Sequence, residues 1–243
     1  MKSTFAIVFS VLGLAYAHPT RRDDNPIRIL PPNWGFEITS LRGPGCPDFG
    51  VPDGKDRHTR LTYGMNTVDG SEIYYSFIAY PALRVELGGG GGVESTWCET
   101  ELQYTEYKDG AGRVEGEDYR LRLHKNGSIA VSTYDIDSGV TATFRFTYLD
   151  ADVTDSNTIR GPAASGEITH DVYLAGPTSG SPHEVTECGA TKLRFRTELK
   201  IEAKGEGRKK GVVDSYHSTD DQGKVQYYGT QMGFSYDWQK CKK

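Results

Sequence analysis

The sequence lacks long hydrophobic runs everywhere except at its start. The one run there, residues 5–14, is shorter than the roughly 20 apolar residues that a membrane-spanning helix needs. Lys2 precedes this run, and an Ala-x-Ala motif at residues 15–17 follows it. This order of positive charge, apolar centre and small-residue cleavage site is typical of a secretory signal peptide. We therefore predict a signal peptide over residues 1–17, an extracellular or cell-wall-associated protein, and no membrane insertion.

The segment after the signal peptide, residues 18–33, is polar and contains the dibasic pair Arg21-Arg22. This pair is either the cut site of a short pro-segment or an exposed pair in a flexible lead-in. The remaining residues 34–243 are enough for one hydrophobic core, and all-β sandwiches of this size are routinely single domains. We predict one domain over residues 34–243.

The chain also lacks an excess of positive charge. It has 28 Lys and Arg residues against 33 Asp and Glu residues. Residues 1–22 contain three of the basic residues and no acid, so without them the counts are 25 and 33 and the net charge is −8. Proteins that bind nucleic acid or anionic membranes usually present basic patches. We therefore expect neither of these as a partner.

Motifs of common metal and nucleophile enzymes are absent too. The sequence has no His-x-His, His-Glu-x-x-His or Gly-x-Ser-x-Gly, and no Lys-Ser/Thr follows the five glycines at residues 88–92. Asp150, Asp152 and Asp155 have the spacing of calcium ligands, but the glycine and glutamate required at positions six and twelve are replaced by Asp155 and Gly161. We predict no metal and no cofactor, and interpret these acids as a solvated turn.

Acidic residues also occur in pairs. Glu99 and Glu101 share one face of a predicted strand, and Glu115 and Glu117 do so if their segment is extended. A glycosidase needs two carboxylates about 5–9 Å apart across a cleft, which neighbours on one strand face do not provide. A solvated strand face is the preferred interpretation, and an extracellular hydrolase remains an alternative.

What the sequence contains is alternation of apolar and polar residues. Between residues 192 and 201 every second position carries Leu193, Phe195, Leu199 or Ile201, with Thr197 completing the row, and charged residues lie between them. This period of two is typical of a strand with one buried and one solvated face. Similar patterns predict strands at residues 34–41, 60–65, 73–80, 96–104, 119–124, 129–134, 140–148, 167–174, 209–216 and 234–241. In the first of these, Trp34, Phe36, Ile38 and Ser40 share one face.

These strands predict an all-β fold, an antiparallel two-sheet β-sandwich. Residues 125–128 contain Asn-Gly and predict a tight hairpin turn. The same stretch contains the only N-glycosylation sequon, at Asn126, and a hairpin tip would expose it for modification. Residues 150–166 are expected to form a long polar connection.

Four cysteines in a secreted chain predict two disulfides, for which three pairings are possible. We favour Cys46 with Cys98 and Cys188 with Cys241, because each bond then closes one half of the chain. Each loop has about 52 residues, so each bond should stabilise the fold by roughly 4 kcal/mol. The second bond should clamp the far ends of the strands at 192–201 and 234–241. A zinc site is disfavoured because no Cys-x-x-Cys occurs.

The sequence around the cysteines resembles a known family. Gly45-Cys46-Pro47 is followed by Cys98 at the head of an alternating strand, then by Cys188-Gly189 and by a Trp-x-x-Cys motif that ends at Cys241. This ordered set resembles the domain of unknown function 4360 family, secreted proteins of fungi and some bacteria. The resemblance covers roughly residues 34–241, and the glycine run at 88–92 departs from it. It implies a secreted, disulfide-bonded, largely β domain and no particular activity.

Tyrosines are the remaining binding candidates. The strand at residues 73–80 contains Tyr74 and Tyr75 on opposite faces. Tyrosines on its outer face, together with Tyr227 or Tyr228, could form a stacking platform for sugar rings, although core packing explains more of these aromatics.

These observations favour a non-enzymatic secreted protein that binds cell-wall glycan or a host protein, as an effector or virulence-associated factor. The alternatives are an extracellular hydrolase with a glycosidase-like carboxylate pair and a structural protein of the cell wall. Finding two buried, opposed carboxylates would favour the hydrolase.

Overall fold

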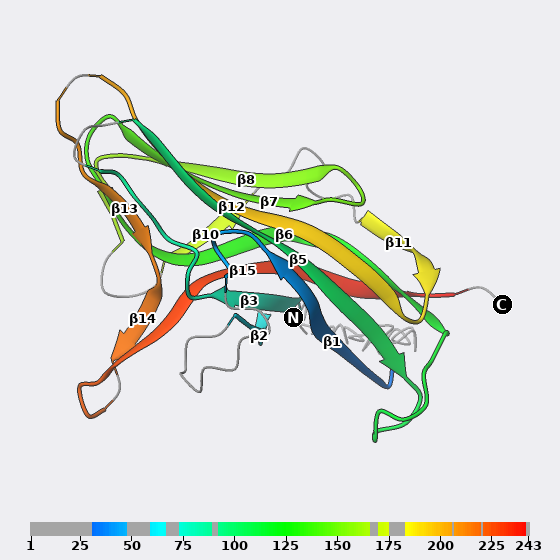
Figure 1. The fold of residues 1–243 in the computed structure, drawn as a ribbon. Helices are drawn as coiled ribbons and strands as arrows, with labels where there is room; N and C mark the ends of the chain where they lie inside the picture. Colours follow the sequence, from blue (N-terminus) through cyan, green and yellow to red (C-terminus); the bar gives the residue numbers. More distant parts are fainter. Residues whose placement is uncertain are drawn as a thin grey trace, which may run out of the picture.

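The computed structural model describes residues 31–47, 59–66, 73–88, 92–165, 170–174, 183–205, 207–219 and 221–241. Within these ranges the chain forms strands, turns and loops, and it contains no helix that could cross a membrane. The strands form two antiparallel sheets that pack face to face (Figure 1). The predicted all-β sandwich is therefore confirmed. The predicted signal peptide and most of the lead-in lie outside the described residues.

The smaller sheet has five strands in the order β1-β5-β12-β7-β8. Their bounds are β1 Asn33–Arg42, β5 Val93–Tyr107, β12 Thr191–Ala203, β7 Val140–Tyr148 and β8 Val153–Arg160. Strands β5 and β12 pair over twelve residues, and β12 and β7 over nine. The middle of this sheet is thus regular and long.

The larger sheet has ten strands and is built around β6, Tyr119–Ile136. Its main path is β2 Arg60–Asn66, β3 Ile73–Tyr80, β15 Val225–Lys240, β6, β13 Gly211–Asp214 and β4 Val85–Glu86. The short strands β9 Ala163–Ala164, β10 His170–Leu174 and β11 His183–Cys188 also pair with β6, and β14 Tyr216–Thr219 pairs with β15. In Figure 1, β13 and β14 lie at one end of the molecule and β11 lies at the other, near the C-terminus.

The core fills the space between the sheets as the alternation predicts. In β12, Leu193, Phe195, Leu199 and Ile201 are all buried, and so is Thr197 in the same row. Phe195 stacks on Phe146 of β7 at 4.8 Å and meets Phe234 of the other sheet at 5.8 Å between ring centroids. Because Phe195 and Phe234 belong to different sheets, this aromatic contact joins the two layers. Burying each large apolar side chain stabilises the fold by about 1.5–3 kcal/mol.

The predicted hairpin at residues 125–128 is wrong. The chain runs straight through as β6, and the irregularity is a bulge against β15. Between the pairs Leu123–Tyr236 and Ser128–Phe234, β6 advances five residues while β15 advances two. Gly127 has φ +75°, and a Cβ there would lie 2.9 Å from the Leu174 carbonyl oxygen. The Asn-Gly pair therefore absorbs extra residues within a strand instead of reversing the chain.

The polar connection predicted at residues 150–166 is also wrong, because it contains β8 and β9. The inward side of β8 carries Val153, Asp155, Asn157 and Ile159. Two polar residues occupy the middle of that row, so the apolar alternation is lost. The buried Asp155 carboxylate instead accepts a hydrogen bond from Ser128 Oγ of the opposite sheet at 2.6 Å.

Strand β1 contains a smaller correction. Ser40 was expected on the inner face with Phe36, but the register against β5 shifts between Ile38 and Ser40. After the shift Leu41 packs against the core, and Ser40 is exposed. The bulge lets an apolar residue replace a polar one at the buried position.

Both predicted disulfides are present, Cys46–Cys98 and Cys188–Cys241, with Cα–Cα distances of 5.6 and 6.4 Å. The strands that the second was expected to clamp lie in different sheets. Cys188 ends β11 and Cys241 follows β15, and both strands pair with β6. The bond therefore ties the larger sheet at the corner from which the chain crosses to the smaller one.

Candidate ligand-binding face

The outer surface of the five-stranded sheet carries a dense set of charged side chains. Since alternate residues of β5, β12 and β7 are buried, the residues between them point away from the core. We call this surface the charged face. It comprises Arg42, Trp97, Glu99, Glu101, Arg145, Asp150, Lys192, Arg194, Arg196 and Glu198.

One row of the charged face crosses four strands with alternating sign. Arg42 of β1 pairs with Glu99 of β5, whose Oε1 lies 3.7 Å from Arg196 Nη1 of β12. Arg196 Nη2 lies 3.7 Å from Glu198 Oε2, and Glu198 Oε1 lies 3.5 Å from Arg145 Nη1 of β7. The strand register alone brings these five residues together.

A second group lies beside this row. Lys192 Nζ donates to Glu101 Oε1 at 2.8 Å, and Thr39 Oγ1 donates to the same oxygen at 2.9 Å. These donors lower the pKa of Glu101. Arg194 Nε donates to Asp150 Oδ1 at 2.9 Å, and this carboxylate raises the pKa of Arg194. Both acids are therefore committed to cations.

Arg196 occupies the centre of the charged face, with its guanidinium carbon 4.3 Å from the centroid of the Trp97 ring. Such cation–π contacts fix the plane of a guanidinium. Its two carboxylate neighbours, at 3.7 Å, are too distant for hydrogen bonds. Its Nε is buried without a hydrogen-bond partner. Arg196 is thus held in place by the Trp97 ring and two ion pairs, while its Nη atoms make no hydrogen bond to either carboxylate.

Trp97 is held from a second direction by the turn after β1. Gly43 has φ +135°, and a Cβ at Gly43 would lie 2.7 Å from Cε3 of the Trp97 ring. Only glycine allows this approach. The nearby Cys46–Cys98 bond fixes the same turn to β5, so the support beneath Arg196 is covalently anchored.

Of the tyrosines predicted as a stacking platform, Tyr75 and Tyr228 are not brought together. Tyr75 is buried, lies beside Phe77 at 5.9 Å between ring centroids, and pairs with Ser235. Tyr228 is half-buried and lies seven positions along β15 from Ser235, which is about 23 Å on an extended strand. The side chains of Tyr74 and Tyr227 lie outside the description, and so does that of Asn126 in the β6 bulge.

The three aspartates of the calcium-like motif diverge. Asp150 binds Arg194, Asp152 is exposed with φ +52°, and Asp155 is buried against Ser128. Within the described ranges no three His, Cys, Asp or Glu side chains converge as metal ligands. Glu99 and Glu101 share the outer face of β5, and each contacts cations, which matches a solvated strand face.

The fully buried carboxylates among the described residues are Glu106 and Asp155. Glu106 accepts backbone hydrogen bonds from Asp118 at 3.3 Å and Tyr119 at 3.0 Å, and burial raises its pKa. Across the sheet, the pairing of β8 with β7, β7 with β12 and β12 with β5 places Asp155 level with Cys98 of β5. Glu106 lies eight residues after Cys98 along β5, which is about 26 Å from that level. These two acids do not form the pair that a glycosidase needs.

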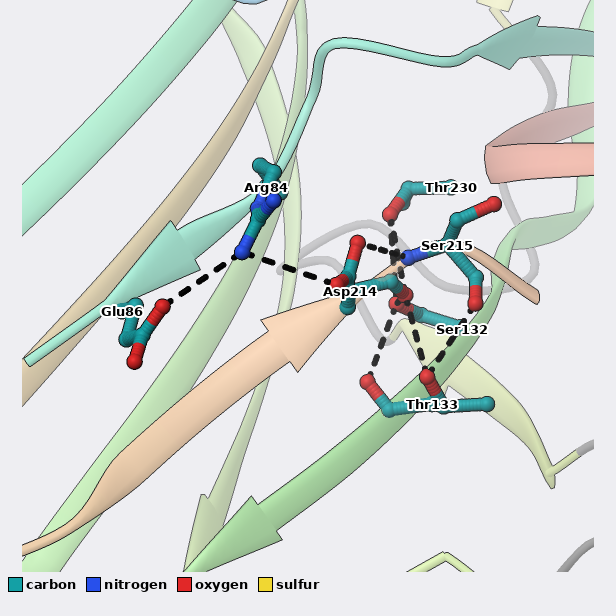
Figure 2. A network of polar contacts seen from close by, with 7 residues as sticks. All are labelled: Arg84, Glu86, Ser132, Thr133, Asp214, Ser215 and Thr230. Carbon is teal, nitrogen blue, oxygen red and sulfur yellow. Dashed lines mark hydrogen bonds and ion pairs between the residues drawn. The ribbon is translucent and has the colours of Figure 1, made fainter. Parts of the chain in front are cut away.

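Another polar cluster, at the end of β13, has a structural role (Figure 2). The hydroxyls of Ser132 and Thr230 donate to the Asp214 carbonyl at 2.7 and 3.5 Å. Arg84 lies 3.7 Å from the Asp214 carboxylate. At this point the chain changes its pairing partner, because β13 pairs with β6 and the next strand, β14, pairs with β15. The hydroxyls satisfy a backbone carbonyl at this crossover.

No family model matches this chain, and no curated protein matches its sequence. Among solved structures, it is similar to TmCBM61 in complex with β-1,4-galactotriose, at 9% identity over 86% of this chain and 88% of that chain, with a TM-score of 0.18. It is also similar to the family 11 carbohydrate-binding module from Clostridium thermocellum in complex with a β-1,3-1,4-mixed-linked tetrasaccharide, at 7% identity over 82% and 89%, with a TM-score of 0.19. At these TM-scores neither likeness carries weight for the function of this chain.

The sequence analysis missed the Trp97–Arg196 pair. Trp97 lies between the buried Thr96 and Cys98, and Arg196 lies between the buried Phe195 and Thr197. Alternation therefore places both on outer faces. Their contact depends on the pairing of β5 with β12, in which Thr197 lies opposite Cys98. No local signal contains that register.

Proposed function

We propose that this chain is a non-enzymatic polysaccharide-binding β-sandwich that acts outside the cell, and that the charged face holds the ligand. The observation that carries this proposal is Arg196, which is oriented by Trp97 and whose Nη atoms make ion pairs at 3.7 Å but no hydrogen bond to either carboxylate. Sugars are recognised by planar polar groups that are fixed before the ligand arrives. A long regular strand face suits an extended polymer better than a small molecule, which needs a concave pocket.

Two further features support the extracellular part of the proposal. Both disulfides are formed, and disulfides persist in oxidising compartments such as the exterior of the cell. The predicted signal peptide at residues 1–17 agrees with this location. Glycosylation of Asn126 belongs to the same proposal, and mass spectrometry of the secreted protein tests it.

The proposal is tested by affinity electrophoresis of the purified secreted protein in gels that contain different cell-wall polysaccharides. We expect retardation in at least one gel. Replacing Arg196 by Ala should weaken that binding at least about tenfold, which corresponds to about 1.4 kcal/mol. The matched control is Arg84→Ala, an exposed ion-paired arginine directly before β4 and away from the charged face, which should leave affinity within about twofold. Absence of retardation in every gel, or an unchanged Arg196→Ala variant, would contradict the proposal.

A further inference from the structure

The ion pairs of the charged face are asymmetric in exposure. The Arg42 side chain is 76% exposed and its partner Glu99 is 21% exposed. Lys192 and Glu101 show 60% and 27%, and Arg145 and Glu198 show 49% and 22%. In each pair the carboxylate lies closer to the sheet, and the cation forms the outer layer. An approaching ligand therefore meets the cations first.

The main row also carries a local excess of positive charge. It contains Arg42, Arg145 and Arg196 against Glu99 and Glu198, so its net charge is +1 in a chain whose net charge is −5. Because the chain as a whole repels polyanions, a polyanion gains attraction only at such a surface. The sign of this row is thus opposite to that of the whole molecule.

The central pair of residues favours an anion over a neutral sugar. A neutral sugar usually stacks on an open aromatic face, but one face of Trp97 already carries the Arg196 guanidinium. The two Nη atoms of this guanidinium are offered instead, since they make ion pairs at 3.7 Å but no hydrogen bond to either carboxylate, and two such donors match a carboxylate in a bidentate geometry. The same occupied ring makes base stacking, the usual contact with single-stranded nucleic acid, a poor fit.

We infer that the ligand of the charged face is an anionic polysaccharide with a carboxylate on its sugar rings, a polyuronate. This inference rests on the proposed function and names the chemical class of the ligand. Arg196 binds a carboxylate of the polymer, while Arg42 and Arg145 on either side of it, in β1 and β7, contact neighbouring sugars. Glu99 and Glu198 orient these cations from beneath.

The test compares two ligands with one backbone, polygalacturonate and its fully methyl-esterified, uncharged form, by titration calorimetry with the purified secreted protein. We expect the acidic polymer to bind at least about tenfold more tightly, and the difference to shrink between 50 and 500 mM salt because the charges are exposed. Arg145→Gln should weaken binding to the acidic polymer, and Arg84→Gln should not.

The outcomes separate the two proposals. Equal, salt-insensitive binding of the acidic and esterified polymers overturns the inference of an anionic ligand and leaves polysaccharide binding standing. Binding of single-stranded DNA as tightly as polygalacturonate also overturns it, because adsorption would then depend on charge alone. No binding to these polymers or to any neutral polysaccharide overturns the proposed function as well.

Discussion

Carboxylates occur both in the interior of the sandwich and on the charged face, and they have different partners. The interior acids, Glu106 and Asp155, accept hydrogen bonds from neutral groups, namely backbone amides and the Ser128 hydroxyl. The acids of the charged face, such as Glu101 and Glu198, meet lysine and arginine. The interior acids therefore stabilise the path of the chain, whereas the outer acids orient cations. Stability and binding should separate accordingly when each set is changed.

The largest effect on stability is expected from removing the buried Cys46–Cys98 disulfide. The paired substitution Cys46→Ala and Cys98→Ala opens a loop whose ends are 52 residues apart. It should lower the free energy of unfolding by about 4 kcal/mol, measured by urea titration. The control is the paired substitution Lys192→Gln and Glu101→Gln on the charged face. If the control lost as much stability as the cysteine variant, the two regions would not differ as described.

The next effect concerns Asp155, which has no exposed surface. Asp155→Ala leaves the buried Ser128 hydroxyl without the acceptor that it reaches at 2.6 Å, and should cost about 3 kcal/mol of unfolding free energy. Ser156→Ala, one residue along β8 and exposed, should cost less than about 0.5 kcal/mol. A loss for Asp155→Ala as small as that for Ser156→Ala would count against a buried role for this carboxylate.

A third prediction concerns the pH dependence of stability. Burial raises the pKa of Glu106 above its usual value, so the folded protein binds this proton more tightly than the unfolded chain. Its contribution to stability is therefore greatest in acid and falls as pH rises through the interval between the unfolded and folded pKa values. Urea titrations from pH 4 to 7 should show a steeper decline for the wild type than for Glu106→Gln. A wild-type slope no steeper than that of the variant would refute the assignment.

The smallest effect, of opposite sign, is expected at Glu101. Lys192 and Thr39 lower its pKa, so its contribution is present above the unfolded pKa and is lost as pH falls. Because the carboxylate lies on the solvated outer face and its ion pair is screened by water, Glu101→Gln should hardly change stability at pH 7. As pH falls into the acid range, the Glu101→Gln variant should lose slightly less unfolding free energy than the wild type, measured by urea titration. A shift in the direction seen for Glu106 would remove the contrast between the two regions.

Much of this fold could be predicted because alternation depends only on local sequence. The bounds of β3 and β7 were predicted to the residue, and the buried row of β12 was predicted in full. The failures occurred where local signals served another purpose. Asn126-Gly127 forms a bulge because β6 stays paired with β15 on both sides of it. Strand β8 lacks the apolar alternation because the inward-facing Asp155 is polar and accepts a hydrogen bond from Ser128 of the other sheet.

The candidate site was harder to predict than the fold. A tyrosine-rich strand was the strongest sequence signal for binding, yet Tyr75 is buried and far from Tyr228. The charged face has no motif at all, since its residues come from β1, β5, β12, β7 and the turn after β7. Only the register of pairing places Arg196 over Trp97. The contact between Arg196 and Trp97 depends on the pairing of strands that are about a hundred residues apart, which local sequence patterns do not specify.

The pairing of β6 with β15 has a consequence for the timing of folding. A ribosome completes β6 about a hundred residues before Val225–Lys240 exists, so one edge of the central strand of the larger sheet stays open throughout that interval. Non-local pairing of this kind is slow, and an open edge invites association with other chains. Until synthesis reaches the last residues, β3 also lacks one of its two neighbours. Pairing of β15 therefore completes the assembly of the larger sheet. A chain truncated before β15 would expose unpaired edges of β3 and β6 that can associate with other chains.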